Sequence, residues 1–111
     1  MGILVSSYDE KSDIWSLGCV LYEMCTQKKT FDGDNPLAIV KKIIGVQFEP
    51  VSKKLPYSSR LRNLIGKMIQ KEPRKRPSSD DLEKVLVPEW QNMLRAVFSL
   101  FGLFLIFLNF S

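Results

Sequence analysis

The residue types in this chain limit the chemistry that it can perform. Its 111 residues include two cysteines, 12 acidic and 16 basic residues, and no histidine. Without histidine, the chain has no Ser-His-Asp or Cys-His nucleophile, no histidine-ligated zinc or haem, and no histidine pH switch. Any catalysis by the chain alone would therefore use carboxylates, amines, hydroxyls or the two thiols. The length allows one small domain.

The two thiols do not form a recognisable reactive or metal-binding motif. Cys19 and Cys25 lie six residues apart in an apolar run. This spacing fits neither a redox C-x-x-C motif nor a zinc site. We interpret both as buried, reduced thiols of a cytoplasmic protein. No secretory signal peptide is expected, because charged residues at positions 9, 10, 11 and 13 interrupt the N-terminal segment.

The net charge of +4 is distributed unevenly along the chain. Residues 53–76 contain nine basic side chains and a single acidic one, Glu72. Such a segment can attract phosphate or an acidic surface. Within it no aromatic residue follows Tyr57, so nucleic-acid bases would have nothing to stack on. We interpret the segment as solvated helix faces and turns, and we expect no nucleic-acid partner.

The spacing of apolar residues predicts an all-α fold. A first helix is expected to begin at Ser12 or Asp13 and to continue through an apolar run. Because this helix is apolar nearly all round, it should lie inside a larger core. A second helix is expected over residues 36–44, with Pro36 in its first turn and Gly45 as its stop.

Two further helices and a hydrophobic tail complete the expected fold. Residues 46–57 are predicted to form an extended loop, and a third helix should start near Ser58. Residues 78–81 should cap a short fourth helix that Pro88 ends. No charged residue follows Arg95, and phenylalanine occupies every third position from 98 to 110. We therefore expect a helical region at residues 1–88 and a hydrophobic tail, itself helical, at 89–111. The third helix should bury Leu61, Leu64, Ile65, Met68 and Ile69.

Two short motifs carry a family resemblance. Residues 13–18 match D-x-W-S-x-G, and residues 72–77 match D/E-P-x-x-R-P. The two motifs, about sixty residues apart with amphipathic helices between them, resemble the C-terminal helical lobe of a eukaryotic protein kinase. The sequence of residues 8–23 is most similar to that of the NIMA-related Ser/Thr kinases. The resemblance covers residues 4–87.

The resemblance implies structural roles for the first motif. Asp13 would accept hydrogen bonds from backbone amides of the catalytic loop, which suits a carboxylate at a helix N-terminus. Trp15 would fill the space beneath the substrate-binding segment. Gly18 would let a neighbouring backbone approach closely.

Four other positions take roles from the same resemblance. Val20 and Met24 would support the stack of apolar residues beneath the adenine. Arg76 would pair with the glutamate of the A-P-E element. Glu23 matches a position that can contact a substrate arginine in relatives directed at basic sequences; its alternative role is that of a helix-packing carboxylate.

The family reaction needs groups that this sequence does not contain. Transfer of phosphate from Mg-ATP to protein Ser/Thr uses a glycine-rich loop, a strand lysine, an H-R-D loop and a D-F-G metal site. None of these motifs, nor A-P-E, occurs in the sequence. We therefore expect no catalytic, metal-binding or cofactor-binding residue here, and a fragment that is inactive alone. Mg-ATP would bind only in the complete family domain.

A second function of a different class stays open. The chain would then be a non-catalytic interaction module that binds a protein substrate or a partner kinase through the 36–44 helix and the basic surface of residues 53–76. In this hypothesis the module is cytoplasmic, either free or tethered to a membrane through residues 96–110.

The two ends of the chain allow several interpretations. As a helix, the 16 uncharged residues span roughly 24 Å, which is short of the roughly 30 Å bilayer core. The tail is a marginal membrane anchor, a helix packed on the kinase lobe or a non-native extension. Residues 1–6 fit the M-G-x-x-x-S pattern of N-myristoylation. We prefer to interpret them as an ordinary segment that follows A-P-E.

Overall fold

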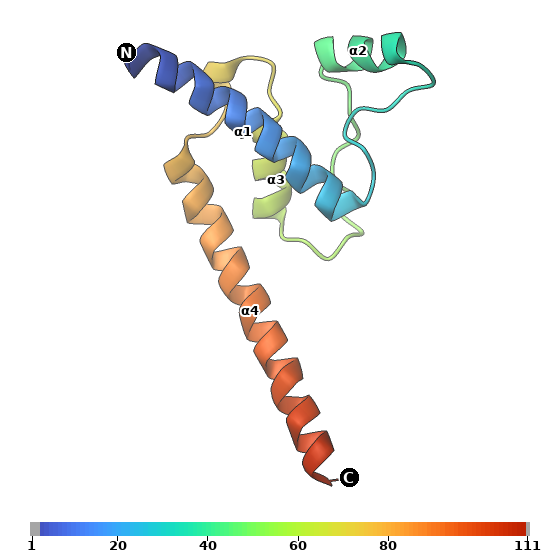
Figure 1. Cartoon of the computed structure of the whole chain (residues 1–111), viewed down its shortest axis with the longest axis vertical. Coiled ribbons are helices and arrows are strands. Elements are labelled where there is room, and N and C mark those ends of the chain that lie inside the picture. Colours follow the sequence, from blue (N-terminus) through green and yellow to red (C-terminus); the bar gives the residue numbers. More distant parts are fainter. Residues whose placement is uncertain (1–2, 111) are drawn as a thin grey trace.

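The computed structural model describes the backbone of residues 3–110 and most side chains from Glu10 onward. All the secondary-structure elements within these residues are helices, as predicted (Figure 1). A long α1 crosses α3, α2 stands apart from both, and α4 extends away as a rod (Figure 1). The elements in chain order are α1 (Ile3–Thr26), α2 (Pro36–Ile44), α3 (Ser59–Met68), the short 3-10 helix η1 (Pro73–Lys75) and α4 (Ser79–Phe110).

The predicted start of the first helix is wrong. We expected Ser12 or Asp13 to cap it, but α1 begins at Ile3 and both residues lie inside it. No proline or glycine occurs between Ile3 and Asp13, so nothing interrupts the helical backbone there. The two residues therefore occupy interior positions of α1, where capping is not required.

One face of α1 packs against α3 at very short range. Ile14, Gly18 and Tyr22 are buried and recur every four residues, which places them on one side of the helix. A Cβ atom built on Gly18 would lie 2.7 Å from the Cβ of Met68 and 3.0 Å from Cγ1 of Ile69. The two helices can cross this closely only because residue 18 has no side chain.

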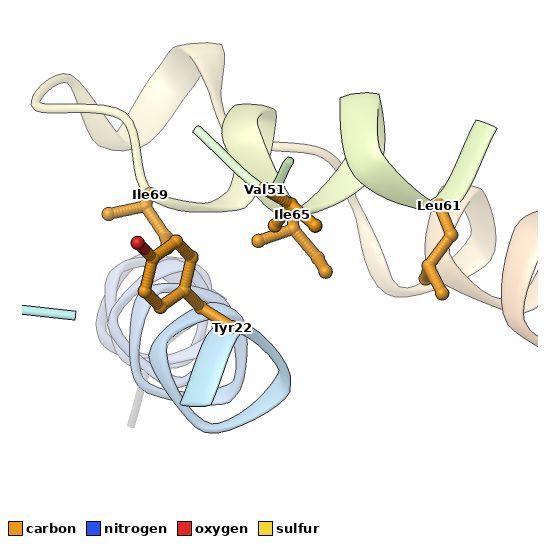
Figure 2. Close-up of a cluster of buried hydrophobic side chains, with 5 residues drawn as sticks. All are labelled: Tyr22, Val51, Leu61, Ile65 and Ile69. Atoms are coloured by element: carbon orange, nitrogen blue, oxygen red, sulfur yellow. The ribbon is translucent and has the colours of Figure 1, made fainter. Parts of the chain in front are cut away.

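Helix α3 supplies the centre of the core. All five residues predicted to be buried on and just after it are buried: Leu61, Leu64, Ile65, Met68 and Ile69. Tyr22 of α1 and Val51 of the preceding loop join three of them in one cluster, which Figure 2 shows. Ile14 and Leu82 join the other two in a second cluster that connects α1, α3 and α4. The third predicted helix is thus confirmed in position and in the face that it buries.

A row of aromatic rings connects α1 to the loops on either side of α2. The Trp15 ring stacks on Phe31, with centroids 5.9 Å apart and an interplanar angle of 7°. Phe31 meets Phe48 edge-on at 6.0 Å, and Phe48 meets Tyr22 edge-on at 5.6 Å. Such pairs stabilise by about 0.5–1.5 kcal/mol beyond their buried area. The row fixes both loops although α2 itself contributes no buried residue.

The predicted second helix is confirmed, with one difference at its end. Asn35 caps α2, its side-chain oxygen accepting a hydrogen bond from the amide of Ala38 at 2.9 Å, and Gly45 is the C-cap. Gly45 keeps a right-handed φ of −83°, whereas Val46 takes the left-handed φ of 49°. The amide of Gln47 then donates to the carbonyl of Lys42, as in a Schellman motif. The valine accepts backbone strain that glycine would avoid.

The predicted cap of the fourth helix is confirmed, but its predicted end is wrong. Ser78 and Asp81 form reciprocal hydrogen bonds between side chain and backbone, the arrangement of a capping box. We expected Pro88 to end the helix, yet α4 continues to Phe110 and joins the separately predicted tail helix. Proline removes one hydrogen bond, to the carbonyl of residue 84, and good helix formers follow it. Within the described part of the chain, no helix combines the length and the apolar content that crossing a bilayer requires.

Replacing Gly18 with alanine should destabilise the crossing of α1 and α3. The added methyl group overlaps Met68 and Ile69, so we expect the free energy of unfolding to fall by about 1–3 kcal/mol. Gly66→Ala is the matched control, because nothing lies within 4 Å of a Cβ there and alanine favours the helix by about 0.5–1 kcal/mol. Urea unfolding of the full chain measures both. Equal effects of the two substitutions would contradict the close approach.

Asp81 should make the stability of α4 depend on pH. The backbone amide and hydroxyl of Ser78 lower the pKa of Asp81 below its usual 3.8. This carboxylate therefore stabilises the fold above the pKa of the unfolded chain, and the contribution is lost as the pH falls through the lower folded pKa. We expect Asp81→Asn to lower the thermal midpoint at pH 7, with the difference vanishing in strong acid.

A neighbouring substitution separates the charged contact of Asp81 with Ser78 from the general effect of a negative charge in the first turn. Asp80→Asn removes a carboxylate from the same first turn of α4 but leaves the bond between Ser78 and Asp81 in place. Thermal unfolding monitored by circular dichroism should show a smaller loss for Asp80→Asn than for Asp81→Asn. Equal losses would show that the helix dipole alone accounts for the effect.

Candidate functional site

The guanidinium of Arg76 joins the two sequence motifs. Its Nη1 donates to the carbonyl of Lys11 at 2.8 Å, and its Nε donates to the carbonyl of Gln70 at 2.8 Å. Nη2 donates to the carbonyl of Lys71 at a longer 3.3 Å. In return, the ammonium of Lys11 donates to the carbonyl of Arg76 at 2.6 Å. Because these bonds run in both directions, α1 and the segment around η1 are held in one register.

Trp15 lies directly under this guanidinium. The Cζ atom of Arg76 is 4.9 Å from the centroid of the Trp15 ring, a cation–π distance. The same ring stacks on Phe31. Trp15 therefore links the aromatic row to the Arg76 hydrogen bonds. We call Lys11, Trp15 and Arg76 the motif junction.

A hollow of about 470 Å³ opens beside the motif junction. It lies between α1, α2 and η1, and both apolar and polar side chains line it. Ser12, Ser16 and Lys71 provide hydroxyl and amine groups, while Ile43 and Ile44 of α2 provide apolar surface. Such a lining suits contact with another polypeptide segment better than it suits a metal ion.

A second polar cluster holds Glu23. The hydroxyl of Thr30 lies 3.1 Å from Oε2 of Glu23 and 3.2 Å from the carbonyl of Cys19. The Thr30 amide donates to the same Oε2 at 3.3 Å. Thr30 is 5% exposed, so Glu23 satisfies a buried hydroxyl as well as meeting solvent. The carboxylate thus has a local structural partner, and its contact with a substrate stays a prediction.

The thiols are poorly suited to nucleophilic chemistry. Burial raises the pKa of Cys19, although the Thr30 hydroxyl partly opposes this, and the Glu23 charge adds to the increase. Burial also raises the pKa of Cys25. Neither cysteine forms a disulfide. Both thiols therefore stay protonated at neutral pH, although they are half-buried rather than buried as expected.

The predicted site residues do not all gather in one place. Trp15 and Arg76 meet at the motif junction, and Gly18 lies under α3. Asp13, Val20 and Met24 lie elsewhere on α1 and are exposed, Val20 by 53% and Met24 by 62%. The roles that the family resemblance gives these residues stay predictions.

Sequence reasoning missed Lys11, Thr30 and Phe31. Lys11 contacts Arg76 through two hydrogen bonds, one accepted by its carbonyl and one donated by its ammonium, and no spacing rule predicts both bonds. Thr30 and Phe31 lie in a loop without a motif. The one available signal was the position of Lys11 two residues before the D-x-W-S-x-G motif.

Comparison with known proteins decides the family. Residues 3–90 match the protein kinase domain. The chain belongs to that family. Within it, the chain falls among the NIMA-related Ser/Thr kinases, in agreement with the resemblance of residues 8–23.

Several NIMA-related kinases are similar to this chain. The identities are 51% to a Dictyostelium discoideum protein named nek3, 47% to serine/threonine-protein kinase Nek5 of Homo sapiens and 48% to serine/threonine-protein kinase Nek1 of Mus musculus. The aligned stretches cover 68%, 69% and 68% of this chain, and 6%, 11% and 6% of those proteins. The chain therefore spans a small part of its kinase relatives.

The expected absence of an Mg-ATP site from these residues stays a prediction. Among the described side chains, no group of three or more His, Cys, Asp and Glu residues could hold a metal ion. The glycines of the described residues lie singly along the chain, and Gly18 is closed over by α3. The geometry of this kinase segment instead serves to hold α1, α3 and η1 together.

Arg76→Lys should weaken the motif junction. One ammonium cannot replace three guanidinium donors that point at three different carbonyls, so we expect a loss of about 1–3 kcal/mol in the free energy of unfolding. Arg74→Lys changes an exposed arginine of the same turn and should alter stability by less than about 0.5 kcal/mol. Chemical unfolding of the full chain compares the two variants.

A double-mutant cycle isolates the ring contact within the junction. Trp15→Leu alone, Arg76→Gln alone and the two together should reveal a coupling of about 0.5–2 kcal/mol, because glutamine carries no charge to place over the ring. Additive effects would show that Trp15 and Arg76 contribute independently, contrary to the stacked geometry.

Proposed function

We propose that this chain supplies the scaffold and substrate-facing part of a NIMA-related Ser/Thr kinase domain and transfers no phosphate by itself. The observation that carries the proposal is the motif junction, where the D-x-W-S-x-G and E-P-x-x-R-P elements interlock through Arg76, Trp15 and Lys11. Family membership supports protein Ser/Thr as the substrate class of the complete domain.

The chemistry of the reaction supports this division of roles. Kinases accelerate phosphoryl transfer by positioning ATP, metal ions and the attacking hydroxyl, and by stabilising the charge that develops on the phosphoryl group. The groups that do this lie in the glycine-rich, H-R-D and D-F-G elements, which this sequence does not contain. In this proposal, other segments of a complete domain bind ATP, and the present helices hold those segments in place.

The uncovered face of α1 supports the same proposal. Leu17, Val20 and Met24 recur at intervals of three and four residues and are 40%, 53% and 62% exposed. Large apolar side chains in one helical row indicate a missing neighbour rather than scattered surface residues. The ATP-binding segments of a complete kinase domain would cover this face.

A second candidate function, a non-catalytic interaction module, rests on α2. This helix buries none of its residues, and Leu37, Val40, Ile43 and Ile44 are exposed by 42–65%. Lys41 and Lys42 adjoin this apolar surface. A short helix that is held by loops and exposes apolar side chains suits docking of a protein partner. In this hypothesis the partner is a protein substrate or a second kinase.

An exchange of segments tests the kinase proposal. The stretch of the human Nek5 kinase domain that aligns with this chain would be replaced by the corresponding residues of this chain. If these residues are a working scaffold, the chimaera should phosphorylate the protein substrates of Nek5 within about tenfold of its normal rate, because the groups that act on ATP are unchanged.

Two controls make the exchange decisive. The isolated full chain should neither phosphorylate those substrates nor bind Mg-ATP in calorimetry. Arg76→Lys within the chimaera should lower its thermal stability, whereas Arg74→Lys should not. A folded chimaera without activity would contradict the proposal and favour the interaction module. Binding of ATP by the isolated chain would contradict the assignment of the ATP-binding groups to other segments of a complete domain.

A further inference from the structure

A hollow of about 580 Å³ lies between α3, η1 and the first turns of α4. Its apolar lining consists of Leu64, which is buried, and Pro77 and Val85, which are half-buried. This surface does not include the Trp15 side of the motif junction or the exposed face of α2. We call it the basic groove, because cations surround the apolar residues.

The cations of the basic groove come from three elements. Arg60 and Lys67 lie seven residues apart, two turns along α3, so they share a face with Leu64. Lys75 of η1 and Lys84 of α4 complete the rim, and Arg76 of the motif junction also lines the groove. Arg60, Lys67, Lys75 and Lys84 are exposed, which keeps their charges hydrated in the absence of a ligand.

Among the described residues that line the basic groove, one carries a negative charge, and its carboxylate is already hydrogen-bonded. Asp81 carries the one carboxylate among the described residues that line it. That carboxylate accepts a hydrogen bond from the Ser78 amide at 3.1 Å. The groove therefore has a net positive charge, and attraction to an opposite charge is the property that it offers a ligand.

We propose that the basic groove binds an acidic segment of a partner protein, in which Asp or Glu residues flank an apolar side chain. The carboxylates meet Arg60, Lys67, Lys75 and Lys84, and the apolar side chain covers Leu64 and Val85. Complementary charge of this kind speeds association and selects the partner, while apolar contact contributes affinity. This inference goes beyond the proposed kinase function, because it needs only α3, η1 and α4.

The lining of the groove favours a peptide over a nucleic acid. No aromatic side chain is among the described residues that line it, so single-stranded bases have no ring to stack on. A sugar-phosphate backbone would also leave the Leu64 and Val85 surface without an apolar partner. A side chain such as leucine, flanked by glutamates, satisfies both parts of the surface.

Fluorescence anisotropy of the full chain tests the proposal. The probe is a fluorescein-labelled peptide with glutamates on both sides of a central leucine, measured at low and at physiological ionic strength. We expect saturable binding that weakens with salt. Replacing the leucine by glycine, or the glutamates by glutamines, should weaken binding, because each change removes one half of the match.

Charge reversal locates the site. Lys67→Glu together with Lys84→Glu should weaken peptide binding by roughly tenfold or more, since two attractive contacts become repulsive. Lys53→Glu together with Lys54→Glu makes the same change in net charge outside the groove and should alter binding by less than about twofold. Lys67→Gln with Lys84→Gln repeats the test if circular dichroism shows that the reversed variant does not fold.

Several outcomes would overturn the inference. Absence of binding at low salt, or equal weakening by the two lysine pairs, would show that the groove is not a specific site. Unchanged binding of the glycine peptide would remove the role of Leu64 and Val85. Tighter binding of a labelled oligothymidylate that is lost in the Lys67 and Lys84 variants would assign the groove to nucleic acid instead.

Discussion

The crossing of α1 and α3 at Gly18 is the contact on which the rest of the structure depends. A side chain there would overlap Met68 and Ile69, so the absence of a Cβ sets the distance between the two helices. That distance decides whether Tyr22 and Ile14 reach the clusters on α3. It also brings Lys11 within reach of Arg76. The hydrogen bonds between Lys11 and Arg76 therefore depend on the same close approach.

The side of α1 that faces α3 is buried in the core, whereas another side of α1 is exposed to solvent. The α3 side has two clusters of buried residues, while Leu17, Val20 and Met24 remain exposed on the opposite row. Exposed apolar rows on a domain of this size favour association with another surface. A partner that binds this row in the folded state would therefore add to the stability of the chain.

Local sequence signals predicted the parts of the fold in which a side chain contacts residues close to it in the sequence. The helix start near Ser58, the Ser78 cap and the buried face of α3 follow from short-range spacing. The helix ends at Ile3 and Phe110 did not follow, because a cap or a proline signals a preference that neighbouring turns can outweigh. The two motifs singled out Trp15 and Arg76 but did not predict that their side chains meet, and the part of Lys11 depends on a contact across 65 residues. No local pattern encodes such a contact.

Pro88 makes the long α4 helix easier to bend at one turn, although the helix is drawn without a break (Figure 1). The missing amide donor leaves one turn with fewer bonds than those on either side, so bending stiffness is lowest there. On the inner side of this point Leu82 is anchored in the core, and on the outer side the rod leaves the body of the molecule. A force on the part of α4 beyond Pro88 would therefore bend the helix at this turn, and the packing of α1 and α3 would be little disturbed.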